Sequence, residues 1–433
     1  MWSGRGALRG ACAAMLMCAM APPPAHAVSA SWSVFATVGY AQSDRDFQYL
    51  RWIDDGGTFN ADSVAGAQLD LQFTPRWSAT VQMRARPATD HDSRWEVEPN
   101  WAFLAWRPAD GWLLRAGKLR VPLYLYSEIL DVGAAYDMAR LPMEMYSLAP
   151  INELLGFSVG YDRPLDDAGD YQLNVNLFGG SDEVTTRGWV PNGIPGLLPA
   201  GAHFLDTDAR ALGVAFDLTA PDTRLRALVL RSHAEPDGGV PVRFPYVDLG
   251  FGGLGYHAVA GPGVEYRDAL HNDLYTLGLE HRFGARWRVT AEYARIVQRD
   301  VELGSDSHGG YLALFRECGR ATPYVSFGRL KSTQDQLDIY RGLAASPLPA
   351  GSLGGAEVFI NAAGQAVAAQ SYTTDQRTLA LGGSLAVAGG KLKFEWAHTW
   401  VDDTSRLIDE RPGDALLKDR QFNVWTLTYS IAL

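Results

Sequence analysis

The sequence predicts an all-β fold, a transmembrane antiparallel β-barrel of sixteen strands. Three features of the sequence predict it. Apolar and polar residues alternate in sixteen segments, the connectors alternate between short and long, and aromatic residues gather at the segment ends beside short connectors. The composition of the 433 residues fits, because 47% are hydrophobic and 20% charged, too hydrophobic for a disordered chain. A net charge of -11 argues against non-specific binding of nucleic acid.

The first 27 residues have the pattern of a secretory signal peptide. Arg5 and Arg9 precede an apolar run over residues 11–21, three prolines follow, and Ala25-His26-Ala27 provides the small residues that a signal peptidase requires. The run has about half the ~20 residues of a membrane-spanning helix. We therefore expect residues 1–27 to be a cleaved signal peptide and residues 28–433 to form the barrel. After cleavage only Cys318 remains, which excludes an intramolecular disulfide.

The expected strands are recognised by a period of two residues. In residues 77–86 the odd positions are apolar and the even positions are polar or charged, and residues 66–73, 171–177 and 391–400 repeat this alternation. Such alternation is typical of a strand with one apolar and one polar face. The sixteen segments are residues 32–43, 64–73, 77–86, 101–107, 112–118, 155–162, 171–178, 208–218, 223–233, 271–283, 287–299, 310–316, 321–332, 375–387, 391–401 and 420–431.

The connectors between these segments alternate between short and long. Residues 74–76, 284–286 and 388–390 are short connectors, whereas residues 119–154 and 333–374 are long ones. The architecture of a soluble β-sandwich does not require every long loop to lie at one end. That of an outer-membrane barrel does, because its periplasmic turns are short and its external loops are long.

Aromatic residues give an independent indication. Trp77, Trp112 and Trp287 begin segments immediately after short connectors, and Tyr161 and Phe283 lie just before such connectors. Amphipathic rings at these positions are typical of the girdle at the boundary between lipid and water. The pattern therefore favours a membrane barrel over a sandwich.

One stretch carries a recognisable motif. The sequence GKLRVPLYLYSE at residues 117–128, continued by residues 130–133 and by RLPMEMY at residues 140–146, resembles the region after the fifth strand of Gram-negative porins, including the phosphate-selective group. The resemblance implies a homotrimeric, water-filled pore in the outer membrane whose third long loop folds into the lumen. The final strand alternates as in the family but ends in Leu433, where the family usually has Phe.

The polar faces of the expected strands carry more basic than acidic residues. Five acids share the inward face, namely Asp70, Asp217, Glu280, Glu292 and Glu395. The basic residues expected to line the pore are Arg84, Arg86, Arg115, Arg224, Arg226, Arg282, Arg288, Lys391 and Lys393. The expected constriction loop is mostly acidic, with Arg120, Glu128, Asp131, Asp137, Arg140, Glu144 and Glu153. A basic wall that faces an acidic loop would produce a transverse field across the narrow section.

These features lead to the hypothesis of a porin for the passive diffusion of small hydrophilic solutes and ions, with weak anion preference. The acidic constriction loop argues against phosphate specificity. The alternative is a plugged, structural or adhesive barrel without an open pore. We expect no enzymatic activity and no cofactor, because no Ser and His pair shares a strand face and the acidic clusters of the external loops lack calcium-loop spacing. The expected partners are membrane lipid and lipopolysaccharide.

Overall fold

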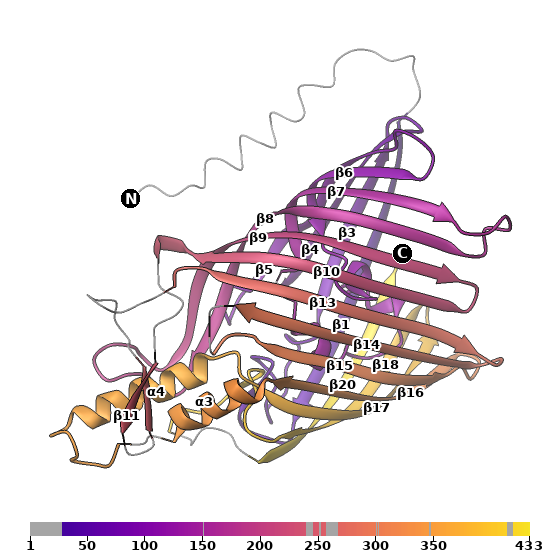
Figure 1. Cartoon of the computed structure of the whole chain (residues 1–433). Helices are drawn as coiled ribbons and strands as arrows, with labels where there is room; N and C mark the ends of the chain where they lie inside the picture. Colours follow the sequence, from indigo (N-terminus) through magenta and orange to yellow (C-terminus); the bar gives the residue numbers. More distant parts are fainter. Residues whose placement is uncertain are drawn as a thin grey trace.

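The computed structural model describes residues 28–149, 151–239, 246–250, 253–256, 267–299, 301, 303–345, 348–413 and 419–433. Within these residues sixteen antiparallel strands close into one barrel (Figure 1). The barrel strands are β1 (Ser29–Ser43), β3 (Val64–Gln72), β4 (Trp77–Pro87), β5 (Trp95–Trp106), β6 (Trp112–Arg120), β7 (Glu153–Pro164), β8 (Gln172–Val190), β9 (Gly201–Ala220), β10 (Thr223–Pro236), β13 (Leu270–Phe283), β14 (Trp287–Arg299), β15 (Ser307–Arg316), β16 (Ala321–Ser332), β17 (Asp375–Val387), β18 (Gly390–Val401) and β20 (Arg420–Ala432).

The remaining elements lie in the connectors. They are β2 (Gln48–Tyr49), β11 (Tyr246–Gly250), β12 (Gly253–Tyr256), β19 (Ile408–Asp409), η1 (Ser127–Ile129), η2 (Gly133–Ala135), η3 (Asp237–Gly239), α2 (Met143–Tyr146), α3 (Gln334–Ala344) and α4 (Ala356–Gln370). No helix among the described residues is both long and apolar enough to cross a membrane.

Each barrel strand pairs with its neighbour in the chain, and the first strand closes the ring. β1 pairs with β3 from Ser29 opposite Gln72, and with β20 from Phe35 opposite Ala432. Closure leaves no barrel strand with an unpaired edge, which is the condition for a sheet to span lipid. The all-β fold of sixteen strands predicted from the alternation is confirmed.

Three strands extend furthest beyond the ranges predicted from the sequence. β8 and β9 continue as a paired ribbon as far as Val190 opposite Gly201, outside the predicted ranges 171–178 and 208–218. Beyond the lipid neither face of a strand has to be apolar, so pairing continues although the alternation stops. β5 begins at Trp95 rather than at residue 101, and a register irregularity beside Pro99 interrupts its period of two.

The outer face of the barrel carries the predicted aromatic rings. Trp77 stacks on Trp106 with ring centroids 5.5 Å apart, and the rings of Trp112 and Tyr161 are 4.8 Å apart. All four rings are exposed and lie beside short turns. Between them and the external loops lies a belt of exposed apolar side chains, including Val81, Leu277, Leu312, Phe327 and Phe394. The belt and the rings match the surface that a bilayer covers.

The long loops gather at one end of the barrel. In Figure 1, α3 and α4 lie together with β11 at the lower left, away from the short turns. Ala363 and Ala366 of α4 pack against Val190 at the end of β8 and against Ile194 in the connection between β8 and β9. Two long loops from separate parts of the ring are thus joined outside the membrane. The predicted signal peptide, residues 1–27, lies outside the described residues.

A lysine on the apolar belt tests whether the belt faces lipid. Leu277 is exposed at the middle of β13, so Leu277→Lys is expected to lower the free energy of unfolding by roughly 2–4 kcal/mol, as for charges at the bilayer midplane. His271→Lys at the external end of the same strand is the control and is expected to cost about 0–1 kcal/mol. Denaturant unfolding from lipid vesicles measures both. Equal effects of the two variants would contradict the assignment of the belt to the lipid.

Candidate pore and its constriction loop

The third long loop, residues 121–152 between β6 and β7, runs inside the barrel. The backbone N–H of Leu125 donates to Glu292 Oε2 of β14 over 2.7 Å, and the N–H of Ala139 donates to the Tyr324 hydroxyl of β16 over 3.0 Å. Both wall residues point into the lumen from strands far from β6 in the ring. The prediction that the third loop folds into the lumen is therefore confirmed.

The loop is packed against an apolar part of the inner wall. Leu123 and Met145 of the loop belong to one buried cluster with Leu228, Leu274 and Phe315 of the wall. On an inward face that contacts only water, such large apolar side chains would be exposed to solvent, which is unfavourable. Leu228 and Leu274, on the otherwise polar inward faces of β10 and β13, are the sequence signal for a packed loop, and the alternation of polar and apolar residues alone does not reveal it.

Acidic residues of the loop form ion pairs with basic residues of the wall. Glu128 Oε1 lies 2.8 Å from Arg226 Nη2 of β10. Asp137 lies between two cations, 2.9 Å from Lys391 Nζ of β18 and 2.5 Å from Arg288 Nη2 of β14. At these positions the loop lies directly on the wall, so the acids of the loop and the bases of the wall are in contact and their charges cancel at short range.

A second charge cluster surrounds Asp131. Its Oδ2 accepts hydrogen bonds from Arg84 Nη1 at 2.9 Å and from Arg120 Nη2 at 2.7 Å, and Oε1 of Glu153 lies 3.1 Å from both arginines. Burial would raise the pKa of Asp131, but Arg120 and Arg84 outweigh it and hold the pKa at about 2. The carboxylate therefore stays ionised in a nearly enclosed site.

Two residues assigned to the constriction loop belong to strands instead. Arg120 ends β6 and Glu153 begins β7, and the two lie opposite each other in the register. Of the other expected loop residues, Arg140 pairs with Asp62 of the first external loop at 2.5 Å. Glu144 is buried and accepts a hydrogen bond from Gln376 Nε2 at 2.8 Å. The loop thus contacts the wall through Glu144 and another loop through Arg140.

The nine basic residues expected to line the pore have different surroundings. Arg86 pairs with Glu98 at 2.8 Å, and Arg224 lies 3.4 Å from Asp217. Lys393 Nζ donates to the carbonyls of Gly133 and Met138 in the third loop. Arg282 lies exposed at the periplasmic end of β13, outside the section that the third loop occupies. The fully enclosed members are Arg84, Arg226, Arg288 and Lys393.

Among the described residues, the three largest cavities lie at the outer end, in the middle and at the periplasmic end of the barrel. The outer cavity, of about 530 Å³, lies between the third loop and the first and eighth external loops and is lined by Arg51, Arg140 and Arg406 among others. The middle cavity, of about 180 Å³, is lined by Arg120 and Glu128. The periplasmic cavity, of about 440 Å³, shares Phe103 and Arg115 with the middle one.

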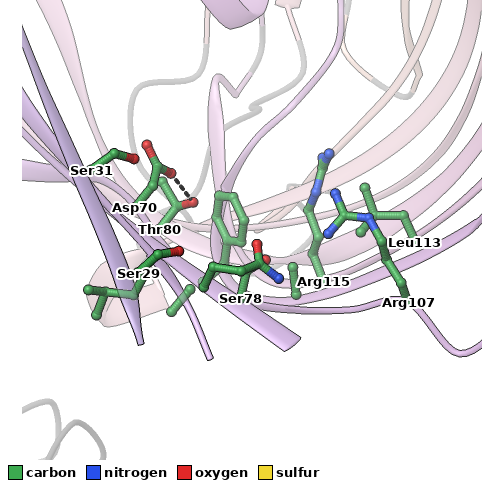
Figure 2. Close-up of a pocket in the computed structure, with 13 residues that line it drawn as sticks. Ser29, Ser31, Asp70, Ser78, Thr80, Arg107, Leu113 and Arg115 are labelled. Carbon is green, nitrogen blue, oxygen red and sulfur yellow. Dashed lines mark hydrogen bonds between the residues drawn. The ribbon is translucent and has the colours of Figure 1, made fainter. Parts of the chain in front are cut away.

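Figure 2 shows the periplasmic cavity. Arg107 and Arg115 project from one side, and Asp70 lies on the other side, where it accepts a hydrogen bond from Thr80 Oγ1 at 2.6 Å. Ser78 lies between them, and Ser29 and Ser31 lie beside Asp70. Charged and small polar groups thus line much of this cavity.

Charged residues also join the external loops above the outer cavity. Arg187 of β8 lies 2.9 Å from Asp92 of the second loop and 2.7 Å from Asp409 of the eighth, and Arg51 of the first loop also reaches Asp92 at 2.6 Å. β8 lies half the ring away from β18 and β20, which flank the eighth loop. The group therefore bridges the external opening. No sequence signal pointed to it.

Among the described residues no group of three or more His, Cys, Asp or Glu side chains has a geometry that could hold a metal ion.

The fold is that of known outer-membrane proteins. OmpT of Vibrio cholerae superposes with a TM-score of 0.51 at 11% identity, covering 95% of this chain and 99% of that one. The trimer form of in-vitro folded OmpT gives 0.50 at 12%, covering 94% and 100%. OprB of Pseudomonas putida gives 0.50 at 9%, covering 93% and 94%. The sequence matches no protein-family model and no curated protein. The chain thus has the fold of Gram-negative outer-membrane porins.

Asp131→Asn tests the charge cluster through its pH dependence. Since the pKa of Asp131 is held at about 2, below its ordinary value, its ion pairs stabilise the fold at and above pH 5, and this stabilisation is lost as the pH falls through about 2. We expect the wild type to exceed Asp131→Asn in free energy of unfolding at pH 5, and this difference to shrink by about 2 kcal/mol at pH 2.

Denaturant unfolding at both pH values measures this difference. Asp110→Asn, in an exposed periplasmic turn, is the control and is expected to match the wild type at both pH values. A gap between wild type and Asp131→Asn that is the same at pH 5 and pH 2 would contradict the assignment.

Proposed function

We propose that this chain forms a water-filled channel in the outer membrane for the passive diffusion of small hydrophilic solutes, with a weak preference for anions. The fold is that of a porin-like channel, and the cavities within the barrel are lined by polar and charged groups. Solutes that carry their own hydrogen-bonding groups can replace the water of such a passage, whereas apolar solutes cannot.

The observation that carries the anion preference is the charge on the cavity walls. The periplasmic cavity has Arg107 and Arg115 against Asp70, and the middle cavity has Arg115 and Arg120 against Glu128. In the outer cavity six basic residues stand against three acidic ones, and the basic ones are Arg51, Arg86, Arg140, Arg187, Lys393 and Arg406. A basic excess that recurs along one route lowers the energy of an anion throughout it.

Arg115 is the residue best placed to act on a passing ion. It lines both the periplasmic and the middle cavity, and its guanidinium carbon lies 5.6 Å from the ring centroid of Phe103. Among the described residues it makes no salt bridge, unlike Arg84, Arg226 and Arg288. Its charge is therefore not neutralised by contact.

The proposal also covers how the chain is exported and how it assembles. We propose that residues 1–27 direct export and are cleaved after Ala27, which N-terminal sequencing of the mature protein tests. We also propose a homotrimer, since OmpT of Vibrio cholerae occurs in a trimer form. Heat-modifiable migration on a gel tests the barrel and the oligomer together.

A plugged barrel is the second candidate, and a specific arrangement favours it. The outer cavity and the middle cavity have no described lining residue in common, and the charge cluster around Asp131, Arg84 and Arg120 lies between them. The external opening is also bridged by Arg187. Single-channel recording in planar bilayers separates the two candidates, because a channel gives discrete conductance steps and a plugged barrel gives none.

Arg115→Gln tests the anion preference. Removing this charge is expected to lower the anion-to-cation permeability ratio roughly twofold, and Arg115→Glu is expected to lower it further, because both cavities that Arg115 lines lose their basic excess. Reversal potentials in a KCl gradient measure the ratio.

The matched control is Arg316→Gln, which removes a charge from the outer wall beside Trp287 and is expected to leave the ratio unchanged. Cation selectivity of the wild type, or equal shifts in both variants, would overturn the anion preference.

A further inference from the structure

The outer wall carries two groups of charged residues just above the apolar belt. In the first, Arg231 Nε of β10 lies 2.7 Å from Asp273 Oδ1 of β13, and Arg299 Nε of β14 lies 2.8 Å from Asp273 Oδ2. One carboxylate thus holds two guanidinium groups from the strands on either side of it. We name this group the first clamp.

The second group repeats the arrangement on neighbouring strands. Lys331 Nζ of β16 lies 2.8 Å from Asp375 Oδ2 of β17, and Arg329 Nη2 lies 3.4 Å from Asp375 Oδ1. We name it the second clamp. The two clamps occupy the same stretch of the ring, which runs through β10, β13, β14, β15, β16 and β17.

In both clamps the acid is covered and the cations are presented outward. The side chain of Asp273 is 5% exposed, whereas those of Arg231 and Arg299 are 72% and 56% exposed. Asp375 is 4% exposed, beneath Arg329 at 42%. Within the residues that the structure describes, each clamp has two positive charges and one negative charge, so an excess positive charge faces the surroundings.

The position of the clamps relative to lipid follows from the strand periodicity. Val229, Tyr275 and Phe327 are exposed belt residues, each two positions from a clamp residue on the same strand and therefore on the same face. The clamps lie on the loop side of these residues. The headgroups of the outer leaflet therefore meet the wall at this height.

On the loop side of the first clamp, the charge of the outer surface changes from positive to negative. His233 and His271 form a cross-strand pair with ring nitrogens 3.0 Å apart, and Glu235 and Asp208 lie opposite each other in the next outward-facing row. Both acids are exposed. At the first clamp the excess positive charge is thus confined to the level next to the belt.

We propose that the two clamps bind the phosphate groups of lipid A, the membrane anchor of lipopolysaccharide. Guanidinium and ammonium groups bind phosphate through charge-assisted hydrogen bonds, and a shared buried carboxylate holds two such cations in place before the ligand arrives. The acyl chains would then cover the belt residues directly beneath. This proposal rests on the membrane location proposed above and is independent of whether the channel is open.

Binding of diphosphoryl lipid A to the folded barrel in detergent tests the proposal, with native mass spectrometry as the readout. Two double variants each remove one clamp, Arg231→Gln with Arg299→Gln, and Arg329→Gln with Lys331→Gln. Each is expected to weaken lipid A binding about tenfold, because charge-assisted contacts to phosphate are lost. Wild type is expected to prefer diphosphoryl over monophosphoryl lipid A and over phosphatidylglycerol.

Arg286→Gln with Arg320→Gln is the matched control, since both arginines are exposed in periplasmic turns. It is expected to bind lipid A as the wild type does. Heat-modifiable gel migration verifies that every variant is folded, and unchanged single-channel conductance separates loss of the lipid site from loss of the channel. Unchanged binding in both clamp variants, or equal loss in the control, would overturn the proposal. A change of oligomeric state without a change in lipid A binding would instead assign the clamps to contacts between copies.

Discussion

The ion pairs between the acids of the third loop and the cations of the inner wall hold the lumen in its observed form. Glu128 and Asp137 meet Arg226, Arg288 and Lys391, and Asp131 meets Arg84. β4 and β14, which carry two of these partners, lie half the ring apart. A charge buried without its partner is costly, so neither the loop nor the wall can hold these groups in the absence of the other.

This neutralisation also decides which charges act on a solute. Where loop and wall are in contact, opposite charges cancel at short range. The charge that remains is carried by residues such as Arg115 and Arg406, which line cavities and have no salt bridge within the described residues. The net charge of the chain, -11, therefore says little about the field inside. On the outer wall the acids Asp273 and Asp375 are likewise covered, and exposed cations surround them.

The strands could be predicted because lipid on one face and polar groups on the other impose a period of two. The ribbon of β8 and β9 beyond the membrane could not, because that constraint ends with the lipid. The inward course of the third loop followed from a family resemblance, although Leu228 on an otherwise polar face already indicated it. Its ion pairs were beyond prediction, since Asp137 and Lys391 are 254 positions apart and no local pattern links them.

The central claim is that the third loop is fixed across the lumen against the far wall. An ideal Cβ atom on Gly133, in the loop, would lie 3.1 Å from the Cβ of Ser430 in β20, close enough for a disulfide after a small adjustment. The direct measurement is mass spectrometry of the variant Gly133→Cys with Ser430→Cys and Cys318→Ser, oxidised in native membranes. The account predicts a disulfide between residues 133 and 430 in nearly every folded molecule. Free thiols at both positions in the folded barrel would contradict it.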